Sequence, residues 1–162
     1  MIQMVVGGLG FDPRNLSPLI LLRDLEELNF LPIWIGIFEA ASIAMELQGV
    51  KPPRPMTHDL IKDILDKFGV KISRVVINDI QNGTFFSLIE TEKDGKKVNL
   101  DARPSDAIAL AVRAKVPIFV SEVVMMQAKL VNAEKDQEET KKFKDFLQNM
   151  KPEDFTKYFK QS

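Results

Sequence analysis

The strongest constraint on the fold is a run of three short segments, residues 72–80, 84–92 and 97–101, in which hydrophobic residues recur at every second position. The dipeptides between them are Asn82-Gly83 and Asp94-Gly95. Asn, Asp and Gly tolerate the positive φ angles that a two-residue hairpin turn requires. The sequence therefore predicts a three-stranded antiparallel meander.

Elements on either side of the meander follow from the same kind of pattern. Apolar runs predict a two-stranded antiparallel opening at 1–9 and 19–22, a buried strand at 31–35 and a short strand at 117–120. Helical spacing predicts helices over 37–48, from Thr57 as N-cap to Phe68, and over 106–114 with Ser105 as N-cap, and a brief helix after Ser121. The expected fold class is α+β, with a mixed, mostly antiparallel sheet packed against helices and a C-terminal helical tail.

The length of 162 residues suits one domain with one core. We expect residues 1–130 to form that domain. Phenylalanines and balanced charges keep helical spacing through the remainder of the chain. Residues 131–162 are therefore expected to form an amphipathic helical tail that docks on the same core or on a dimer partner.

Composition removes several classes of function. The chain has no cysteine, which excludes disulfides, thiolate zinc sites and cysteine nucleophiles. With a single histidine, any metal must be held mainly by oxygen, which favours Mg²⁺ or Mn²⁺. The glycines at 7, 8 and 10 lack the lysine and hydroxyl of a P-loop, so no organic cofactor is expected.

Charge and hydropathy bear on partners and location. The net charge of −1 and the pI of about 5.9 give no overall basic footprint, although a local cluster of Lys and Arg would suffice for phosphate contact. Apolar stretches fall short of the ~20 residues of a membrane span. The chain opens in an apolar β-like run without a basic leader or small-residue cleavage site, so we expect a cytoplasmic protein.

The first candidate site is the strand-to-helix junction that holds Asp101, Arg103, Ser105 and Asp106. Two carboxylates beside an arginine and a helix N-terminus suit a divalent cation together with a phosphate, as metal-assisted phosphodiester hydrolysis requires. The alternative is purely structural. In it Ser105 and Asp106 cap the helix while Asp101 and Arg103 form an ion pair.

The second candidate site follows the proline-rich segment 51–55 and holds Arg54, Thr57, His58 and Asp59. His58 suits a general base, because the pKa of an unperturbed imidazole lies near neutrality. A histidine in the first turn of a helix is also a common surface or capping residue. The spacing does not by itself establish a nucleophile–histidine–acid triad.

The third candidate is the pair Glu39 and Glu46, which form a polar stripe with Ser42 on an otherwise apolar helix. A carboxylate on a buried helix needs a partner such as a metal or an arginine. The simpler interpretation is that the stripe is the solvated side of this helix.

These residues also carry a resemblance. Leu31 to Gly36 with Glu39-Ala40, then Arg54-Pro55 and Thr57-His58-Asp59, then Asp101 to Ala107 and Pro117 to Val120, resemble the bifunctional nuclease domain in order and spacing. The Arg-Pro-Ser-Asp-Ala block is the specific part of the match. The resemblance covers about residues 1–130, and the tail is also similar to that of bacterial members.

The resemblance implies an α+β domain, often a homodimer, with nuclease action on DNA and RNA. The polar clusters described above supply the expected site: Asp101, Arg103, Asp106, His58 and Glu39 are the expected catalytic residues, Arg54, Ser105 and Thr57 are expected to bind substrate, and Asp101 and Asp106 are expected to hold a metal. The competing hypothesis is a non-catalytic module that binds nucleic acid or protein. The acidic pI favours the module, whereas polar residues at a helix start favour the enzyme.

Overall fold

The computed structural model describes residues 1–133 and residue 145. Within this part of the chain seven strands form one sheet: β1 (Ile2–Phe11), β2 (Pro18–Asp24), β3 (Phe30–Trp34), β4 (Lys71–Gln81), β5 (Thr84–Lys93), β6 (Lys96–Ala102) and β7 (Ile118–Val120). Four helices accompany them: α1 (Ile37–Leu47), α2 (Thr57–Lys67), α3 (Pro104–Ala114) and α4 (Glu122–Ala133). Beyond α4, the residues of the expected helical tail lie outside the described part of the chain, with the exception of residue 145.

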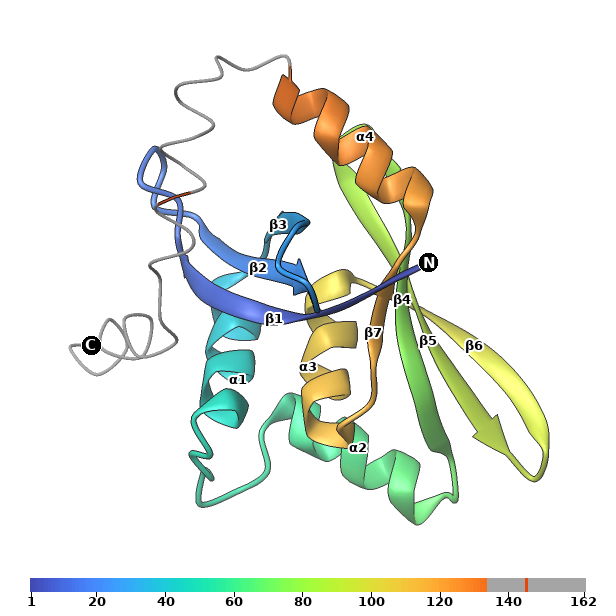
Figure 1. The fold of residues 1–162 in the computed structure, drawn as a ribbon. Coiled ribbons are helices and arrows are strands. Elements are labelled where there is room, and N and C mark those ends of the chain that lie inside the picture. Colours follow the sequence, from blue (N-terminus) through green and yellow to red (C-terminus); the bar gives the residue numbers. More distant parts are fainter. Residues whose placement is uncertain (134–144, 146–162) are drawn as a thin grey trace.

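The strand order is β3-β2-β1-β7-β4-β5-β6 (Figure 1). Neighbouring strands are antiparallel except β4 and β7, which are parallel. The short β7 joins the N-terminal hairpin to the meander, because it pairs with β1 on one side and β4 on the other. The predicted α+β class with a mixed, mostly antiparallel sheet is confirmed.

The meander forms as the turn dipeptides predict. Asn82 and Gly83 have φ angles of 51° and 78°, and Asp94 and Gly95 have 51° and 75°. Positive φ at both central residues is the geometry whose twist matches that of the flanking strands. The β5–β6 hairpin consequently extends from the body, with β6 as the outer strand (Figure 1).

Helix α3 lies at the centre of the helical layer and contacts α1, α2, β4 and β5. Its alanines at 107, 109 and 111 are buried, and these small side chains let the helix lie close to its neighbours. α4 packs on β4 at the opposite end of the molecule from α2 (Figure 1). No helix among the described residues is long and apolar enough to cross a membrane.

Two predicted helix caps were wrong. Arg103, not Ser105, is the N-cap of α3, because Pro104 occupies the first helical position, where its fixed φ and missing N–H suit a helix start. Met56, not Thr57, is the N-cap of α2. There the Asp59 carboxylate accepts the Met56 backbone N–H at 3.0 Å and stabilises the first turn in place of a hydroxyl cap.

Candidate functional site

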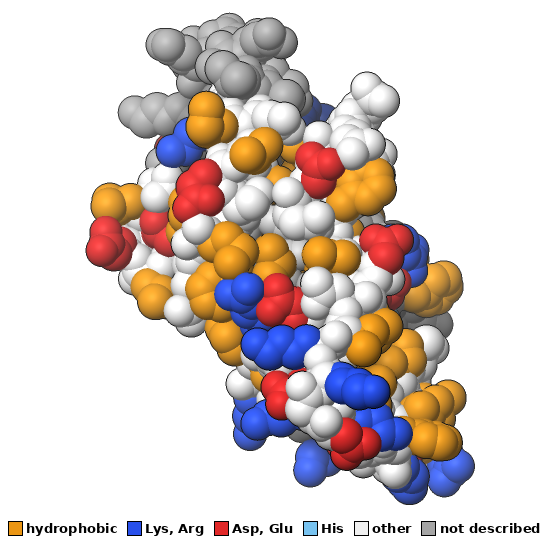
Figure 2. Space-filling model, turned by 90° about the vertical axis from the view of Figure 1, so that its right-hand side faces the viewer, with side chains coloured by type: hydrophobic (Ala, Val, Ile, Leu, Met, Phe, Trp, Pro, Cys, Tyr) orange, Lys and Arg blue, Asp and Glu red, His pale blue; other side chains and the backbone are white. Residues whose placement is uncertain are grey.

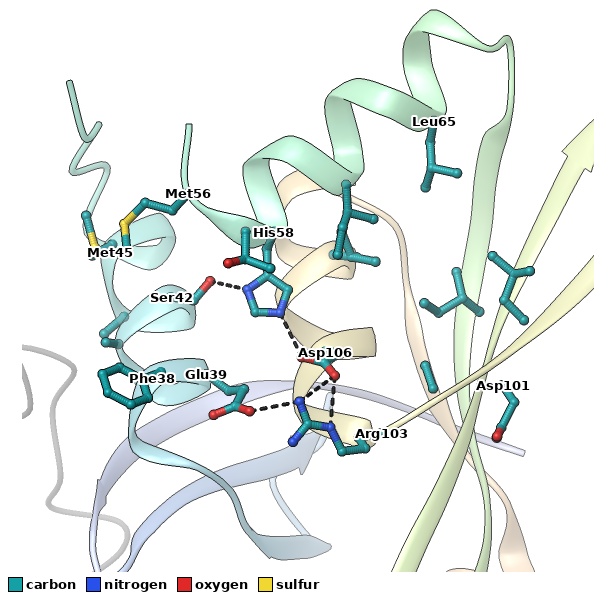
Figure 3. Close-up of a pocket in the computed structure, with 18 of the residues that line it drawn as sticks. Phe38, Glu39, Ser42, Met45, Met56, His58, Leu65, Asp101, Arg103 and Asp106 are labelled. Atoms are coloured by element: carbon teal, nitrogen blue, oxygen red, sulfur yellow. Dashed lines mark hydrogen bonds and ion pairs between the residues drawn. The ribbon is translucent and has the colours of Figure 1, made fainter. Parts of the chain in front are cut away.

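A cleft of about 1100 Å³ opens between α1, α2, α3 and the outer strands β5 and β6 (Figure 3). Most of its wall is apolar, and includes Met45, Met56, Leu65 and Leu100. Polar side chains from α1, α2 and α3 gather on one part of the wall. A ligand in this cleft would therefore meet a polar group at one end and apolar side chains along its length.

His58 is the centre of the polar group. Its side chain is 7% exposed, and both ring nitrogens have partners from other helices. Nδ1 lies 2.7 Å from the Ser42 hydroxyl on α1, and Nε2 lies 2.8 Å from Asp106 Oδ1 on α3 (Figure 3). A carboxylate only accepts, so in the neutral imidazole Nε2 carries the proton and Nδ1 accepts the Ser42 hydroxyl.

Arg103 bridges two carboxylates on the cleft wall. Its Nη2 lies 2.8 Å from both Glu39 Oε1 and Asp106 Oδ2, and its Nε donates to the same Asp106 oxygen at 3.0 Å. The hydrogen bond with Asp106 is the main reason why the pKa of Arg103 is raised above its ordinary value, with a smaller contribution from Glu39. The Arg103 side chain remains 67% exposed, so it is accessible to an anion in solution.

Gly36 makes room for the Glu39 carboxylate. A Cβ at Gly36 would collide with that carboxylate, which turns back over the start of α1. The exposed fraction of the Glu39 side chain is only 16%, and its ion pair with Arg103 compensates its charge. The local sequence Gly36-Ile37-Phe38-Glu39 thus positions one of the two carboxylates that hold Arg103.

Arg113 connects the three helices beneath this group. Its side chain is 7% exposed and donates to Asp59 Oδ1 on α2 at 2.8 Å, to the Ser42 carbonyl on α1 at 3.2 Å and to the Ala109 carbonyl at 2.9 Å. Burial by itself would raise the pKa of Asp59. The hydrogen bonds from Arg113 and from the Met56 backbone outweigh burial, and the pKa of Asp59 is lowered.

The structure brings together predicted residues that are far apart in sequence. Glu39, His58, Arg103 and Asp106 come from three helices and form one continuous chain of hydrogen bonds and ion pairs. Asp101 lies on β6 at another part of the cleft wall, with its carboxylate directed away from Asp106 (Figure 3). Among the described interactions Arg103 pairs with Glu39 and Asp106, so the suggested Asp101–Arg103 ion pair is not formed.

The residues expected to bind substrate are more dispersed. Thr57 lines the cleft, at the first position of α2. Ser105 is buried, with 5% of its surface exposed. Arg54 is exposed in the proline-rich segment and is not among the described residues that line the cleft.

The structure corrects the interpretation of the polar stripe on α1. Ser42 is 6% exposed and contacts His58, and Glu39 contacts Arg103, so this part of the stripe faces the other helices rather than solvent. The solvent-facing residues of α1 include the apolar Phe38. The polar stripe suggested a solvated side of α1 because the sequence pattern of one helix does not show partners that come from α2 and α3.

Sequence reasoning also missed Arg113, and it left Ser42 outside the predicted site. The signal for Arg113 is a single cation on an alanine-rich helix with a buried face, since such a cation needs partners. No comparable signal identifies Ser42. A hydroxyl on an apolar helix acquires its role from His58, sixteen residues away.

The carboxylates around Arg103 are the side chains to consider as ligands of a metal ion. No group of three or more His, Asp or Glu side chains within the described chain is arranged to hold a metal. Glu39 and Asp106 nevertheless converge on one nitrogen of Arg103. Mg²⁺ is often bound by one or two carboxylates, with water and phosphate oxygens completing its shell. These two carboxylates fit that arrangement if Arg103 moves aside, whereas Asp101 and Asp106 do not converge.

Known proteins are similar to this chain over most of its length. Residues 20–133 match the bifunctional nuclease domain. The chain belongs to this family. Family members of similar length include an uncharacterised protein from Mycobacterium tuberculosis, which is 44% identical over 160 residues, or 93% of this chain and 95% of that protein.

Plant members of the family are longer. Bifunctional nuclease 2 of Arabidopsis thaliana is 34% identical over 94 residues, which is 56% of this chain and 29% of that protein. Bifunctional nuclease 1 of Oryza sativa subsp. japonica is 30% identical over 106 residues, or 62% of this chain and 32% of that protein. The similarity to the named nucleases thus covers the shared domain and about a third of each plant protein.

Proposed function

We propose that this chain hydrolyses phosphodiester bonds of DNA or RNA in the cleft between α1, α2 and α3. Family membership and the names of the plant relatives support a nuclease-related function. The observation that carries the proposal is the His58–Asp106–Arg103 group, which sets an imidazole, a carboxylate and an accessible guanidinium side by side on the cleft wall.

Arg103 is proposed to bind the scissile phosphate. Guanidinium groups form paired hydrogen bonds with phosphate oxygens, and most of this side chain is accessible. A phosphate at Arg103 would compete with Glu39 and Asp106 for the same nitrogen. Substrate binding would therefore release a carboxylate beside the reacting phosphorus.

Hydrolysis adds water across a P–O bond, so one proton leaves the attacking water and one reaches the departing oxygen. When the phosphate binds Arg103, the carboxylate of Glu39 or Asp106 is released, and this carboxylate is proposed to take the first proton. His58 in its imidazolium form is proposed to give the second proton to the departing oxygen, and it regains a proton from the protonated carboxylate, which restores both groups. Because both imidazole nitrogens are already bonded, a proton reaches or leaves His58 through Ser42 or Asp106.

Mg²⁺ or Mn²⁺ stays part of the proposal. With Glu39 and Asp106 as ligands, the ion would stabilise negative charge on the phosphate and lower the pKa of a bound water. The sequence predicted that Asp101 and Asp106 bind the metal ion. Substitution of Asp101 tests this prediction.

Contact with nucleic acid beyond the cleft is supported by a local lysine cluster. Lys71, Lys93, Lys96 and Lys97 lie at one end of the β4–β5–β6 meander together with Glu92 and Asp94, and all six side chains are exposed, so cations outnumber anions by four to two there. Lys93 and Lys96 are direct cross-strand partners, an arrangement of like charges that costs stability. Phosphates would relieve that repulsion, so binding is expected to weaken steeply as salt is added.

The test is cleavage of fluorescent single- and double-stranded DNA and RNA, with Mg²⁺, Mn²⁺ or chelator. We expect Asp106→Asn to reduce the rate by about 10²-fold or more, the typical effect of losing a proton-transfer group. Asp101→Asn should retain most of the rate. Lys67→Met, purified in the same way, controls for contaminating nuclease, because Lys67 pairs with Asp63 on the exposed side of α2.

Each result has a distinct meaning. Equal loss in Asp101→Asn and Asp106→Asn would favour a cation shared by these two residues. Equal cutting by the wild type, Asp106→Asn and Lys67→Met would identify a contaminant and refute the proposed site. Thermal midpoints of all variants show whether a loss of rate reflects unfolding.

The second candidate function, a non-catalytic binding module, is favoured by the apolar lining of the cleft. Phe38 lines the cleft with 82% of its surface exposed, and Met56 with 47%. Such surfaces suit binding of bases or apolar side chains more than hydrolysis. Saturable binding of nucleic acid without metal-dependent turnover would support this function. Homodimerisation and a cytoplasmic location stay predictions under either candidate.

A further inference from the structure

The outer strand β6 leaves one edge of the sheet open. It ends the strand order, and no described element pairs with its outer side (Figure 1). Residues 96–101 are exposed, including Val98 at 52% and Leu100 at 39%. A seven-residue edge strand that exposes apolar side chains and unpaired backbone groups is a template for another strand.

The hydrogen bonds to β5 show which backbone groups of β6 face outward. The Thr91 hydroxyl donates to the Val98 carbonyl at 2.8 Å, and the Ser87 hydroxyl donates to the Ala102 carbonyl. These two carbonyls therefore face β5. Neighbouring residues of a strand direct their backbone groups to opposite sides, so the N–H and C=O groups of Lys97, Asn99 and Asp101 face outward.

The order of side chains along this edge is self-complementary when the strand is reversed. In an antiparallel pair centred on Asn99, Lys97 lies opposite Asp101 of a second copy and Val98 lies opposite its Leu100. The outward backbone groups of residues 97, 99 and 101 then meet one another and form about six hydrogen bonds. Lys97 lies opposite Glu92 of β5, but no ion pair joins Lys97 or Asp101 to another side chain within the described chain, so both can pair with a second copy.

We infer that the outer edge of β6 pairs antiparallel with the same edge of a second copy, with the two-fold axis at Asn99. We infer a second copy as the partner because a single register pairs opposite charges, apolar side chains and free backbone groups of the two strands. A shift by one residue would place outward groups opposite groups that already face β5. Figure 2 shows the side of the molecule on which β6 lies, where charged and hydrophobic side chains are intermixed.

The pairing would extend the candidate site. Leu100 lines the cleft, and Val98 of the second copy would lie beside it and lengthen the apolar wall. Asp101 would then serve the interface, which accounts for its distance from the His58 group. The inference does not depend on nuclease activity, because it rests on the edge strand alone.

Size-exclusion chromatography with light scattering tests the inference through Asn99→Pro. Proline at this position removes only an outward N–H, so pairing with β5 should survive. We expect the wild type to approach twice the chain mass of 18.4 kDa as concentration rises, and the variant to stay at 18.4 kDa with an unchanged circular dichroism spectrum. A wild type that stays monomeric, or an Asn99→Pro variant that dimerises like it, would overturn the inference.

Charge reversal tests the register. Lys97→Asp should weaken the dimer roughly tenfold or more, because it replaces two attractions with two repulsions. The double variant Lys97→Asp/Asp101→Lys should restore it, whereas Lys71→Asp, on a strand inside the sheet, should leave it unchanged. Failure of the double variant to restore the dimer would refute this register.

A thiol at the proposed axis gives an independent test. The chain has no cysteine, so Asn99→Cys introduces a single thiol. Opposed residues of a hydrogen-bonded antiparallel pair have Cα atoms about 5.5 Å apart, within disulfide range. We expect rapid oxidation to a covalent dimer for Asn99→Cys and slow oxidation for Ser73→Cys, which is exposed on β4. Equal rates of oxidation in the two variants would argue against the interface.

Discussion

Replacement of Arg113 by methionine should destabilise the protein more than any surface charge substitution. Arg113 is 7% exposed and donates three hydrogen bonds, which join α3 to Asp59 on α2 and to the Ser42 carbonyl on α1. Methionine fills much of the volume but donates nothing. The carboxylate and the two carbonyls therefore lose a charged donor.

The magnitude follows from the burial of each partner. Breaking a buried ion pair costs about 3–5 kcal/mol when the remaining charge stays buried. Asp59 is 28% exposed and can be partly rehydrated, which lowers the expected loss to about 2–4 kcal/mol. For a chain of this size each kcal/mol corresponds to roughly 2–4 °C in the midpoint, so the midpoint should fall by roughly 5–15 °C.

Urea and thermal unfolding followed by the fluorescence of Trp34, the single tryptophan, measure this loss. Lys67→Met is the matched control, because its ion pair with Asp63 lies on the exposed surface of α2. That variant should change stability by less than about 1 kcal/mol. If both variants unfold at the wild-type midpoint, Arg113 does not hold the three helices together. A similar loss in both would show that burial is not the cause.

The pKa of Asp59 in the folded protein is lowered below its ordinary value of 3.8. The stabilisation that the Asp59 carboxylate provides is therefore complete above pH 3.8 and is lost as the pH falls through the pKa of the folded state. Asp59→Asn should flatten the decline of the thermal midpoint below about pH 4. In the neutral form of His58, the single histidine, the ¹⁵N spectrum should place the proton at Nε2, and Ser42→Ala should shift Nδ1 without removing the Nε2 proton; a neutral form with its proton at Nδ1 would contradict the assigned bonds. Gly83→Ala should cost about 1–2 kcal/mol, because φ is +78° and the backbone alone opposes a side chain there; a melting midpoint equal to that of the wild type would show that the turn relaxes.

Local chemistry made the elements predictable. Turn dipeptides, proline positions and hydrophobic period depend on neighbours a few residues away, and most strands and helices of residues 1–133 lie within a few residues of their expected places. The helix after Ser121 was expected to be brief, but α4 runs over the twelve residues Glu122–Ala133. The N-caps were wrong by one or two positions. A hydroxyl, a carboxylate and a proline all compete at a helix start, and the backbone of the preceding segment selects among them.

The meander, the α+β class and most members of the candidate site follow from the amino-acid sequence alone, because glycine, proline and charged residues express their preferences locally. Which of those residues meet depends on the tertiary structure. It places His58 between Ser42 and Asp106, sixteen and forty-eight residues away, and separates Asp101 from Asp106, which is five residues along the chain. This happens because strand β6 and helix α3 leave their junction in different directions, whereas the packing of three helices around Arg113 fixes the geometry of the polar group.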